Sequence, residues 1–279
     1  MFNFLGFSCP LLLAATGALF SEYTGCLALF MDGLISFAGF LTYAFTVATG
    51  SAILGIILSA ITSVGLCLLF AFIIEKSHAN CFIAAIAINL LFSSFTSLFS
   101  WLCFGTRGVL TAKAFTFTLA KTNITSVIIT VILIAGAILY LKKTSGGIYF
   151  RITGSNADVL LVRGVSPDIY RIASWGVAAF FACFAGSFLA LRISSFVPNL
   201  ASGKGWLALA AVFMGKRRLP LIALYTLIFC AVDFAAVYIQ NFIPGIPSSV
   251  VLSLPYIITL GLVIVRPSTK DYIPLLRQD

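Results

Sequence analysis

GLISFAGFLTYAFTVATGSAILGIILSAITSVGLCLLFAFII, residues 33–74, is a run of 42 positions without a single Asp, Glu, Lys or Arg. A helix needs about 20 apolar residues to cross a bilayer, so this run is long enough to cross twice. The triplet at 49–51, Thr-Gly-Ser, interrupts the run and predicts one helix over 33–49 and another over 51–74. The stretch therefore predicts a chain that crosses a membrane more than once.

The rest of the chain repeats this pattern. Hydrophobic residues make up 61% of the 279 positions and charged residues only 9%, against about 25% charged in soluble domains. This composition excludes a soluble enzyme, a disordered chain and a fibrous repeat. We predict an all-α polytopic membrane protein, a single transmembrane domain over 1–279 with about eight spanning helices. The expected helices are 4–20, 33–49, 51–74, 81–104, 124–141, 172–191, 219–240 and 249–265.

The basic residues predict how the chain is threaded. Following the helices outward from the polar loop at 142–171 places 12 of the 17 Lys and Arg on the side of that loop and five on the other side. Because cytoplasmic loops are rich in Lys and Arg, we expect this loop and the C-terminus to be cytoplasmic. The N-terminus has no basic residue before Lys76 and is not placed. The net charge of +9 comes from basic residues that set the orientation of the chain in the membrane, so no nucleic-acid partner is expected.

Histidine and cysteine offer little chemistry. His78 is the only histidine, so no multi-histidine metal site is expected, and none of the seven cysteines forms a CxxC motif. We interpret these cysteines as small buried apolar residues.

A short internal echo suggests two related halves. The segment Gly25-Cys-Leu-Ala-Leu runs on to Gly33, and Gly205-Trp-Leu-Ala-Leu runs on to Gly215. The second piece, 205–215, has only 11 uncharged residues and is too short to span. Short segments at matching places in two halves are typical of broken or re-entrant helices around a midplane site. Chance is the alternative, since Leu-Ala-Leu is common in so apolar a chain.

The loop at 142–171 contains the chain's one large polar stretch. Ser155 or Asn156 can cap a two-turn helix over 156–163, Asp158 lies in its first turn, and Gly164 can end it. The helix is either a solvated connector or a docking element for a cytoplasmic partner. No GxxxxGK[ST] motif is present, so any ATP hydrolysis belongs to another chain.

Five ordered blocks resemble a known family. They are the segments 10–25 (PLLLAATGALFSEYTG), 86–91 (IAINLL), 147–156 (GIYFRITGSN), 203–216 (GKGWLALAAVFMGK) and 254–256 (LPY). Together they are similar to the nucleoside-type permeases of ABC importers, within the branched-chain amino acid, ribose and nucleoside permease superfamily. The blocks follow the family order from residue 10 to about 265, which is nearly the whole chain.

The resemblance implies a transmembrane permease subunit in a bacterial cytoplasmic (inner) membrane, surrounded by lipid. Its expected partners are a second permease subunit, a cytoplasmic ABC ATPase that binds the ATP, and a substrate-binding lipoprotein or periplasmic protein. No catalytic residue, metal or cofactor of its own is expected. The loop then corresponds to the segment that couples to the ATPase, with these residues: Arg151, Gly154, Asn156, Asp158, Arg163 and Gly164.

Departures from the family pattern bear on the solute. Ala28 stands in place of a family Asn, Phe30 in place of a Gly, and Asp32 in place of a Glu. Losing an amide and gaining a ring favours a flat heteroaromatic solute, a purine nucleoside or riboflavin. We expect the solute path to contain six residues, which are Phe30, Asp32, Asn89, Trp206, Phe213 and Asp233.

Each of these candidates has a packing alternative. Asp233 can instead pair with Arg192 or Lys204, and Asn89 can join helices rather than bind solute. Three other functions stay open at this point: a permease for a monosaccharide, one for a branched-chain amino acid, and an ion-coupled secondary transporter. An intramembrane aspartyl protease is disfavoured, because Asp32 and Asp233 lack its motifs.

Overall fold

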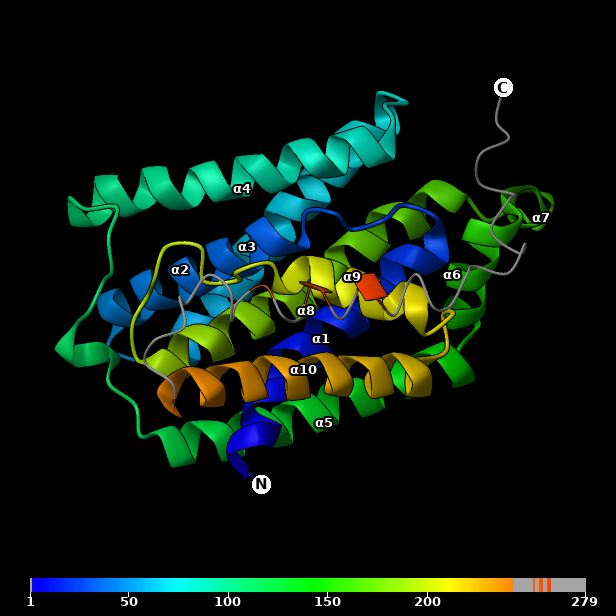
Figure 1. Ribbon diagram of the computed structural model, residues 1–279. Helices are drawn as coiled ribbons and strands as arrows, with labels where there is room; N and C mark the ends of the chain where they lie inside the picture. Colours follow the sequence, from blue (N-terminus) through cyan, green and yellow to red (C-terminus); the bar gives the residue numbers. More distant parts are fainter. Residues whose placement is uncertain (1, 243–252, 254–255, 258–259, 262–279) are drawn as a thin grey trace.

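The structure, a computed structural model, describes residues 2–242 together with 253, 256, 257, 260 and 261. Figure 1 shows its long helices running side by side in one bundle. The helices of the described residues are α1 Phe2–Thr24, α2 Met31–Thr49, α3 Ala52–Lys76, α4 Cys81–Phe104, α5 Leu119–Lys143, α6 Ser145–Ser155, α7 Ala157–Val162, α8 Pro167–Ile193, α9 Lys204–Met214 and α10 Leu219–Phe242, together with a 3₁₀ turn at Lys113–Phe115.

Seven helices in the described part of the chain are long and apolar enough to cross a membrane: α1, α2, α3, α4, α5, α8 and α10. Lipid offers no hydrogen bonds to the backbone, so the apolar runs pair their own N–H and C=O groups by forming helices. This confirms the prediction of an all-α polytopic membrane protein. The eighth expected helix, 249–265, lies largely outside the described residues.

Local sequence sets several of the helix ends. Gly50 and Gly105 adopt left-handed backbone angles and end α2 and α4, a conformation that glycine takes without a steric penalty. The Asn80 side chain accepts hydrogen bonds from the Phe82 and Ile83 N–H groups and so begins α4. These signals explain why most predicted bounds lie close to the observed ones.

The centre of the bundle is formed by α1 and α8, which pack through small residues. A Cβ atom added to Gly17 on α1 would lie 2.8 Å from the Phe181 Cβ of α8, and one added to Gly186 on α8 would lie 2.2 Å from the Ile35 carbonyl oxygen of α2. Glycine at these positions lets the backbones approach closely, as in other membrane bundles. The outer helices α3, α4, α5 and α10 present large exposed apolar side chains, as a lipid-facing surface requires.

The bundle contains two halves of inverted topology. In each half a long central helix ends, a non-helical segment returns into the bundle, and a new helix begins there. In the first half these are α1, residues 25–30 and α2; in the second they are α8, residues 194–203 and α9. Figure 1 shows α1 and α8 running in opposite directions, while α2 and α9 leave the middle of the bundle toward opposite ends.

The sequence echo identified both regions but matched them in the wrong register. Residues 25–29 are mostly non-helical, whereas 205–209 lie inside α9. The structural counterparts are the starting turns of α2 and α9. A five-residue likeness between apolar segments does not carry enough information to fix a register.

The polar loop at 142–171 is more ordered than its sequence suggests. It contains two helices, α6 and α7, where a single helix over 156–163 was expected. Asn156 does occupy the N-cap position of α7, but its side chain makes no capping hydrogen bond. The helix α6 escapes prediction because Gly146, Gly147 and Gly154 lower its helix propensity.

Candidate functional site

The first break, residues 25–30, leaves backbone polar groups inside the bundle, and side chains satisfy them. The Ala28 N–H donates to Ser21 Oγ at 3.0 Å, and the Cys26 carbonyl accepts from Trp175 Nε1 at 3.0 Å. Both contacts are buried, where an unpaired backbone group costs several kcal/mol. The neighbouring helices α1 and α8 therefore stabilise the non-helical conformation of the break.

The first turn of α2 is fixed by α4. The Gly33 N–H donates to Asn89 Oδ1 at 2.7 Å, and a Cβ atom added to Gly33 would lie 2.3 Å from the Asn89 carbonyl oxygen. Of the two interpretations of Asn89, the structure supports joining of helices. Ser93 and Ser97 lie one and two turns further along the same face of α4 and are exposed.

The second break, residues 194–203, is irregular backbone that other helices support. Its Ala201 N–H donates to Ser36 Oγ at 3.1 Å, and its Ser202 carbonyl accepts from the Tyr256 hydroxyl at 2.6 Å. Ser194, Asn199, Ser202 and Gly203 all have left-handed backbone angles. Such a run of unfavourable conformations persists only where its surroundings hold it in place.

The two breaks meet at Asp32. Its carboxylate Oδ1 accepts from the Gly205 N–H at 3.0 Å, and a Cβ atom added to Gly205 would lie only 2.4 Å from the Asp32 backbone nitrogen. Asp32 lies in the first turn of α2, and Gly205 in the first turn of α9. The N-terminal ends of both helices carry partial positive charge, so an acidic side chain between them is stabilised. We call this contact the Asp32–Gly205 junction.

Asp233 lies beside the junction and is paired. Its Oδ2 is 3.4 Å from Lys204 Nζ, and both side chains are more than four-fifths buried. The structure thus favours the pairing interpretation of Asp233 over a free carboxylate on a solute path. Lys204 and Arg192 also approach the face of Phe7, with the Arg192 guanidinium 4.9 Å from the ring centroid. The pairing reduces the cost of charge at membrane depth.

The three aromatic candidates lie in different surroundings. Phe30 is fully buried, and its ring centroid is 4.7 Å from that of Trp175, so the structure assigns it to packing rather than to a solute path. Trp206 and Phe213 are 44% and 41% exposed. Seven residues apart, they share one face of α9, which begins at the Asp32–Gly205 junction.

A buried ion pair holds the end of α1 to the turn between α9 and α10. The Glu22 carboxylate, 3% exposed, accepts from Arg217 Nη2 at 2.8 Å and from its Nε at 3.1 Å. The Tyr23 hydroxyl donates to the Arg217 carbonyl at 2.6 Å. Sequence analysis missed this pair, although a carboxylate at the end of an apolar run was a signal that it needed a cationic partner.

The predicted coupling residues divide into two groups. Arg151 and Gly154 contact the end of α1: the guanidinium lies 5.3 Å from the Tyr23 ring centroid, and a Cβ atom on Gly154 would lie 2.2 Å from the Tyr23 carbonyl oxygen. Asn156, Asp158, Arg163 and Gly164 are exposed around α7. Three apolar side chains of α7 are exposed as well: Val159 at 41%, Leu161 at 58% and Val162 at 90%.

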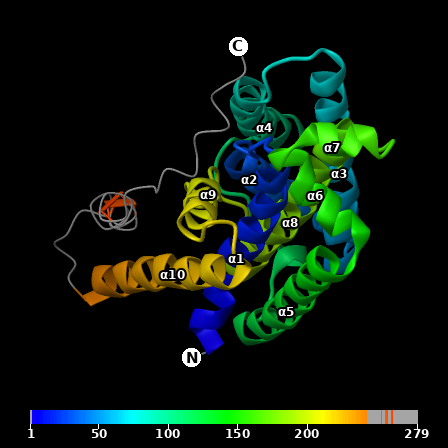
Figure 2. The same cartoon turned by 90° about the vertical axis from the view of Figure 1, so that its right-hand side faces the viewer.

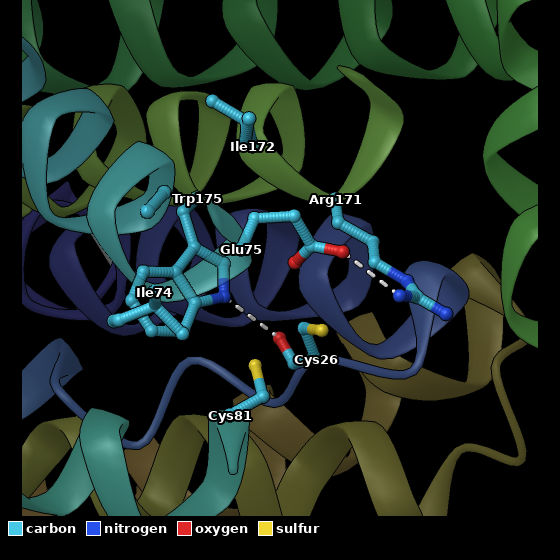
Figure 3. A pocket seen from close by; sticks show the side chains of 8 residues that line it. Cys26, Ile74, Glu75, Cys81, Arg171, Ile172 and Trp175 are labelled. Atoms are coloured by element: carbon cyan, nitrogen blue, oxygen red, sulfur yellow. Dashed lines mark hydrogen bonds and ion pairs between the residues drawn. The ribbon is translucent and has the colours of Figure 1, made fainter. Parts of the chain in front are cut away.

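The space beside the first break is small. Figure 3 shows the Glu75–Arg171 ion pair, with an oxygen–nitrogen distance of 2.9 Å, beside the Trp175–Cys26 hydrogen bond, and the Cys81 side chain pointing toward Cys26. The cavity volume is about 10 Å³, room for one water at most. No solute passes here in this conformation.

Comparisons with known proteins identify the family. Residues 1–265 match the family described as branched-chain amino acid transport system / permease component. The chain belongs to this family of ABC transporter permeases. The resemblance drawn from the sequence blocks is thereby confirmed at the level of the superfamily.

Two relatives and one solved structure are similar to this chain. The permease is 27% identical over 272 residues to the uncharacterized protein MG121 of Mycoplasma genitalium, covering 90% of this chain and 87% of that one. It is 24% identical over 227 residues to a putative glucose ABC transporter permease protein, TsgC13, of Haloferax volcanii, covering 75% of this chain and 68% of the other. The fold is similar to PsaBC from Streptococcus pneumoniae in complex with Fab, with a TM-score of 0.61, 11% identity and coverage of 95% and 91%.

The glycines at which helices approach closely give a first prediction. Gly154→Ala and Gly205→Ala place a methyl group against backbone atoms, and such overpacking costs about 1–3 kcal/mol. We expect both variants of the permease to unfold at a lower temperature in detergent. The readout is the reactivity of the five buried thiols, which unfolding exposes: Cys9, Cys26, Cys67, Cys183 and Cys230.

The matched controls are Gly65→Ala and Gly136→Ala, helical glycines with open space around the added methyl group. These should unfold at or slightly above the wild-type temperature, because alanine favours the helix. Equal destabilisation of all four variants would contradict the close contacts.

Proposed function

We propose that this permease forms the transmembrane path of an ATP-driven importer and that its solute is a heteroaromatic molecule with a hydroxylated tail, a purine nucleoside or riboflavin. The observation that carries the proposal is the pair Trp206 and Phe213, exposed on one face of α9. A helix that starts inside the bundle and presents rings along one side is suited to a planar ligand, because every aromatic base has a face that can stack.

The geometry of α9 supports a path beside it. The helix has 11 residues, a length of about 16 Å, so it covers roughly half of the bilayer. It begins at the Asp32–Gly205 junction and ends at Met214, three residues before Arg217. Broken helices of this kind surround midplane solute sites in transporters.

A monosaccharide is the second candidate, and two observations favour it. The Haloferax volcanii relative carries the description of a putative glucose permease. On α4, the exposed hydroxyls of Ser93 and Ser97 form a polar stripe that can hydrogen-bond a sugar. An ion-coupled secondary transporter is not favoured, because the family consists of ABC transport components.

The solute proposal is tested by uptake of radiolabelled guanosine, riboflavin and ribose in cells that contain the complete importer. Stacking on an aromatic side chain is worth about 1–3 kcal/mol. Losing about 1.4 kcal/mol of it at the transport barrier slows uptake roughly tenfold. We expect this loss in Trp206→Ala and Phe213→Ala for the ring-bearing solutes.

Two controls make that test specific. Leu69→Ala, on the exposed face of α3, should transport normally, and Phe30→Ala should lower the amount of folded permease without changing solute preference. Equal losses for ribose and guanosine in the α9 variants would assign the two rings to packing. Uptake of ribose alone by the wild type would discard the heteroaromatic solute in favour of the monosaccharide.

We also propose that α6 and α7 couple the permease to a cytoplasmic ATPase, with a second permease subunit and a substrate-binding protein completing the importer. The cytoplasmic placement of α6 and α7 follows from the 12 basic residues expected on the side of the loop 142–171. It is supported by the exposed Leu161 and Val162, which water alone would cover poorly. The charged residues around them, Asp158 and Arg163, would provide the polar rim of such a contact.

Coupling is measured as ATPase activity of the reconstituted importer, stimulated by its binding protein. Val162→Asp and Arg163→Glu should abolish the stimulation while the permease inserts and folds normally. The first variant places a charge at an apolar position of the contact, and the second reverses the charge of its rim. Lys113→Glu, exposed at the opposite end of the bundle, is the matched control. Wild-type stimulation in both α7 variants would rule out this docking surface.

A further inference from the structure

A second cavity lies at the end of the bundle that carries α6 and α7. It has a volume of about 570 Å³ and is lined by residues of α1, α5, α6 and the start of α10 with its preceding turn. The lining residues are Tyr23, Ile138, Leu141, Lys142, Arg151, Arg217, Arg218, Leu219, Pro220 and Leu221. Figure 2 shows α5 and α10 on either side of α1. Neither Asp32 nor Gly205 lines this cavity.

The charge of this cavity is strongly one-sided. Among the described residues, its lining contains four cations, Lys142, Arg151, Arg217 and Arg218, and no acidic residue. Arg217 pairs with Glu22, which is buried just behind the lining. Among the described residues, no ion pair involves Lys142, Arg151 or Arg218. Three cations therefore line one cavity, and no anion among the described residues pairs with them.

Other residues of the cavity lining and of its flanks are apolar. Ile138, Leu141 and Leu221 belong to the lining. Further along the two helices, Ile132 on α5 is 63% exposed and Leu224 on α10 is 53% exposed. The cations thus sit where two lipid-facing helices reach the edge of the membrane. A lining that combines cations with apolar side chains suits an amphiphile with an anionic head.

We propose that this cavity binds an anionic phospholipid, its phosphate held by Lys142, Arg151 and Arg218 and an acyl chain lying between α5 and α10. An arginine fork matches phosphate geometry, and lysine adds a point charge. A bound head group would also hold α6 to the α9–α10 turn, because Arg151 and Arg218 come from these two elements. The lipid would therefore stabilise the end of α1 to which both are attached.

The test uses the full-length permease, purified in detergent, and two probe lipids, phosphatidylglycerol and phosphatidylcholine. Lipid retention is measured by native mass spectrometry, and stability by thermal unfolding. We expect phosphatidylglycerol to be retained at least tenfold better than phosphatidylcholine and to raise the unfolding temperature. Lys142→Gln/Arg218→Gln, two exposed positions, should lose this preference while unfolding at the wild-type temperature without lipid.

The control variant Arg107→Gln/Lys113→Gln removes two exposed cations from the opposite end and should keep the preference. The single variant Arg218→Gln, with an expected loss of several fold, serves if the double variant folds poorly. Equal retention of both lipids by the wild type would overturn the proposal. The proposal would also be overturned if Lys142→Gln/Arg218→Gln retained phosphatidylglycerol but no longer bound the ATPase subunit. That result would show that the cavity contacts a partner protein rather than a lipid.

Discussion

A backbone that leaves the helix inside a membrane must find its hydrogen-bond partners within the protein, and this chain does so twice. Residues 25–30 depend on Ser21 and Trp175, and residues 194–203 depend on Ser36 and Tyr256. The two breaks are joined where the Asp32 carboxylate accepts the Gly205 N–H. The close packing of α1, α2 and α8 follows from this requirement, because the partner groups reach the breaks only if the helices approach through glycine.

The same region explains how distant parts of the permease are mechanically connected. The end of α1 contacts α6 through Gly154 and the α9–α10 turn through the Glu22–Arg217 pair. α6 leads into α7, and the turn at Arg217 ends the segment that starts with α9. A displacement of α7 by a partner would therefore reach α9 through a few rigid contacts. In the conformation described here, the space beside the first break is too small to hold a solute.

Much of the fold could be predicted because charge-free runs and membrane thickness leave few alternatives. The run at 33–74 became α2 and α3, and the short piece at 205–215 became α9. The site was less predictable, because its contacts join residues far apart in sequence. Glu22 and Arg217 are separated by 195 positions, and the burial of Phe30 depends on Trp175 of α8. The helix α6 was missed because its glycines, unfavourable for an isolated helix, are the points at which it packs.

The central claim is that the end of α1 transmits changes between α7 and α9, and a double-mutant cycle on the Glu22–Arg217 pair tests it most directly. Removing one partner of a buried ion pair leaves an uncompensated charge, at a cost of about 3–5 kcal/mol. We predict that Glu22→Gln and Arg217→Gln each abolish binding-protein-stimulated ATPase activity in the assembled importer, and that the double variant recovers part of it. Full stimulation in either single variant, or losses that simply add in the double variant, would contradict this account.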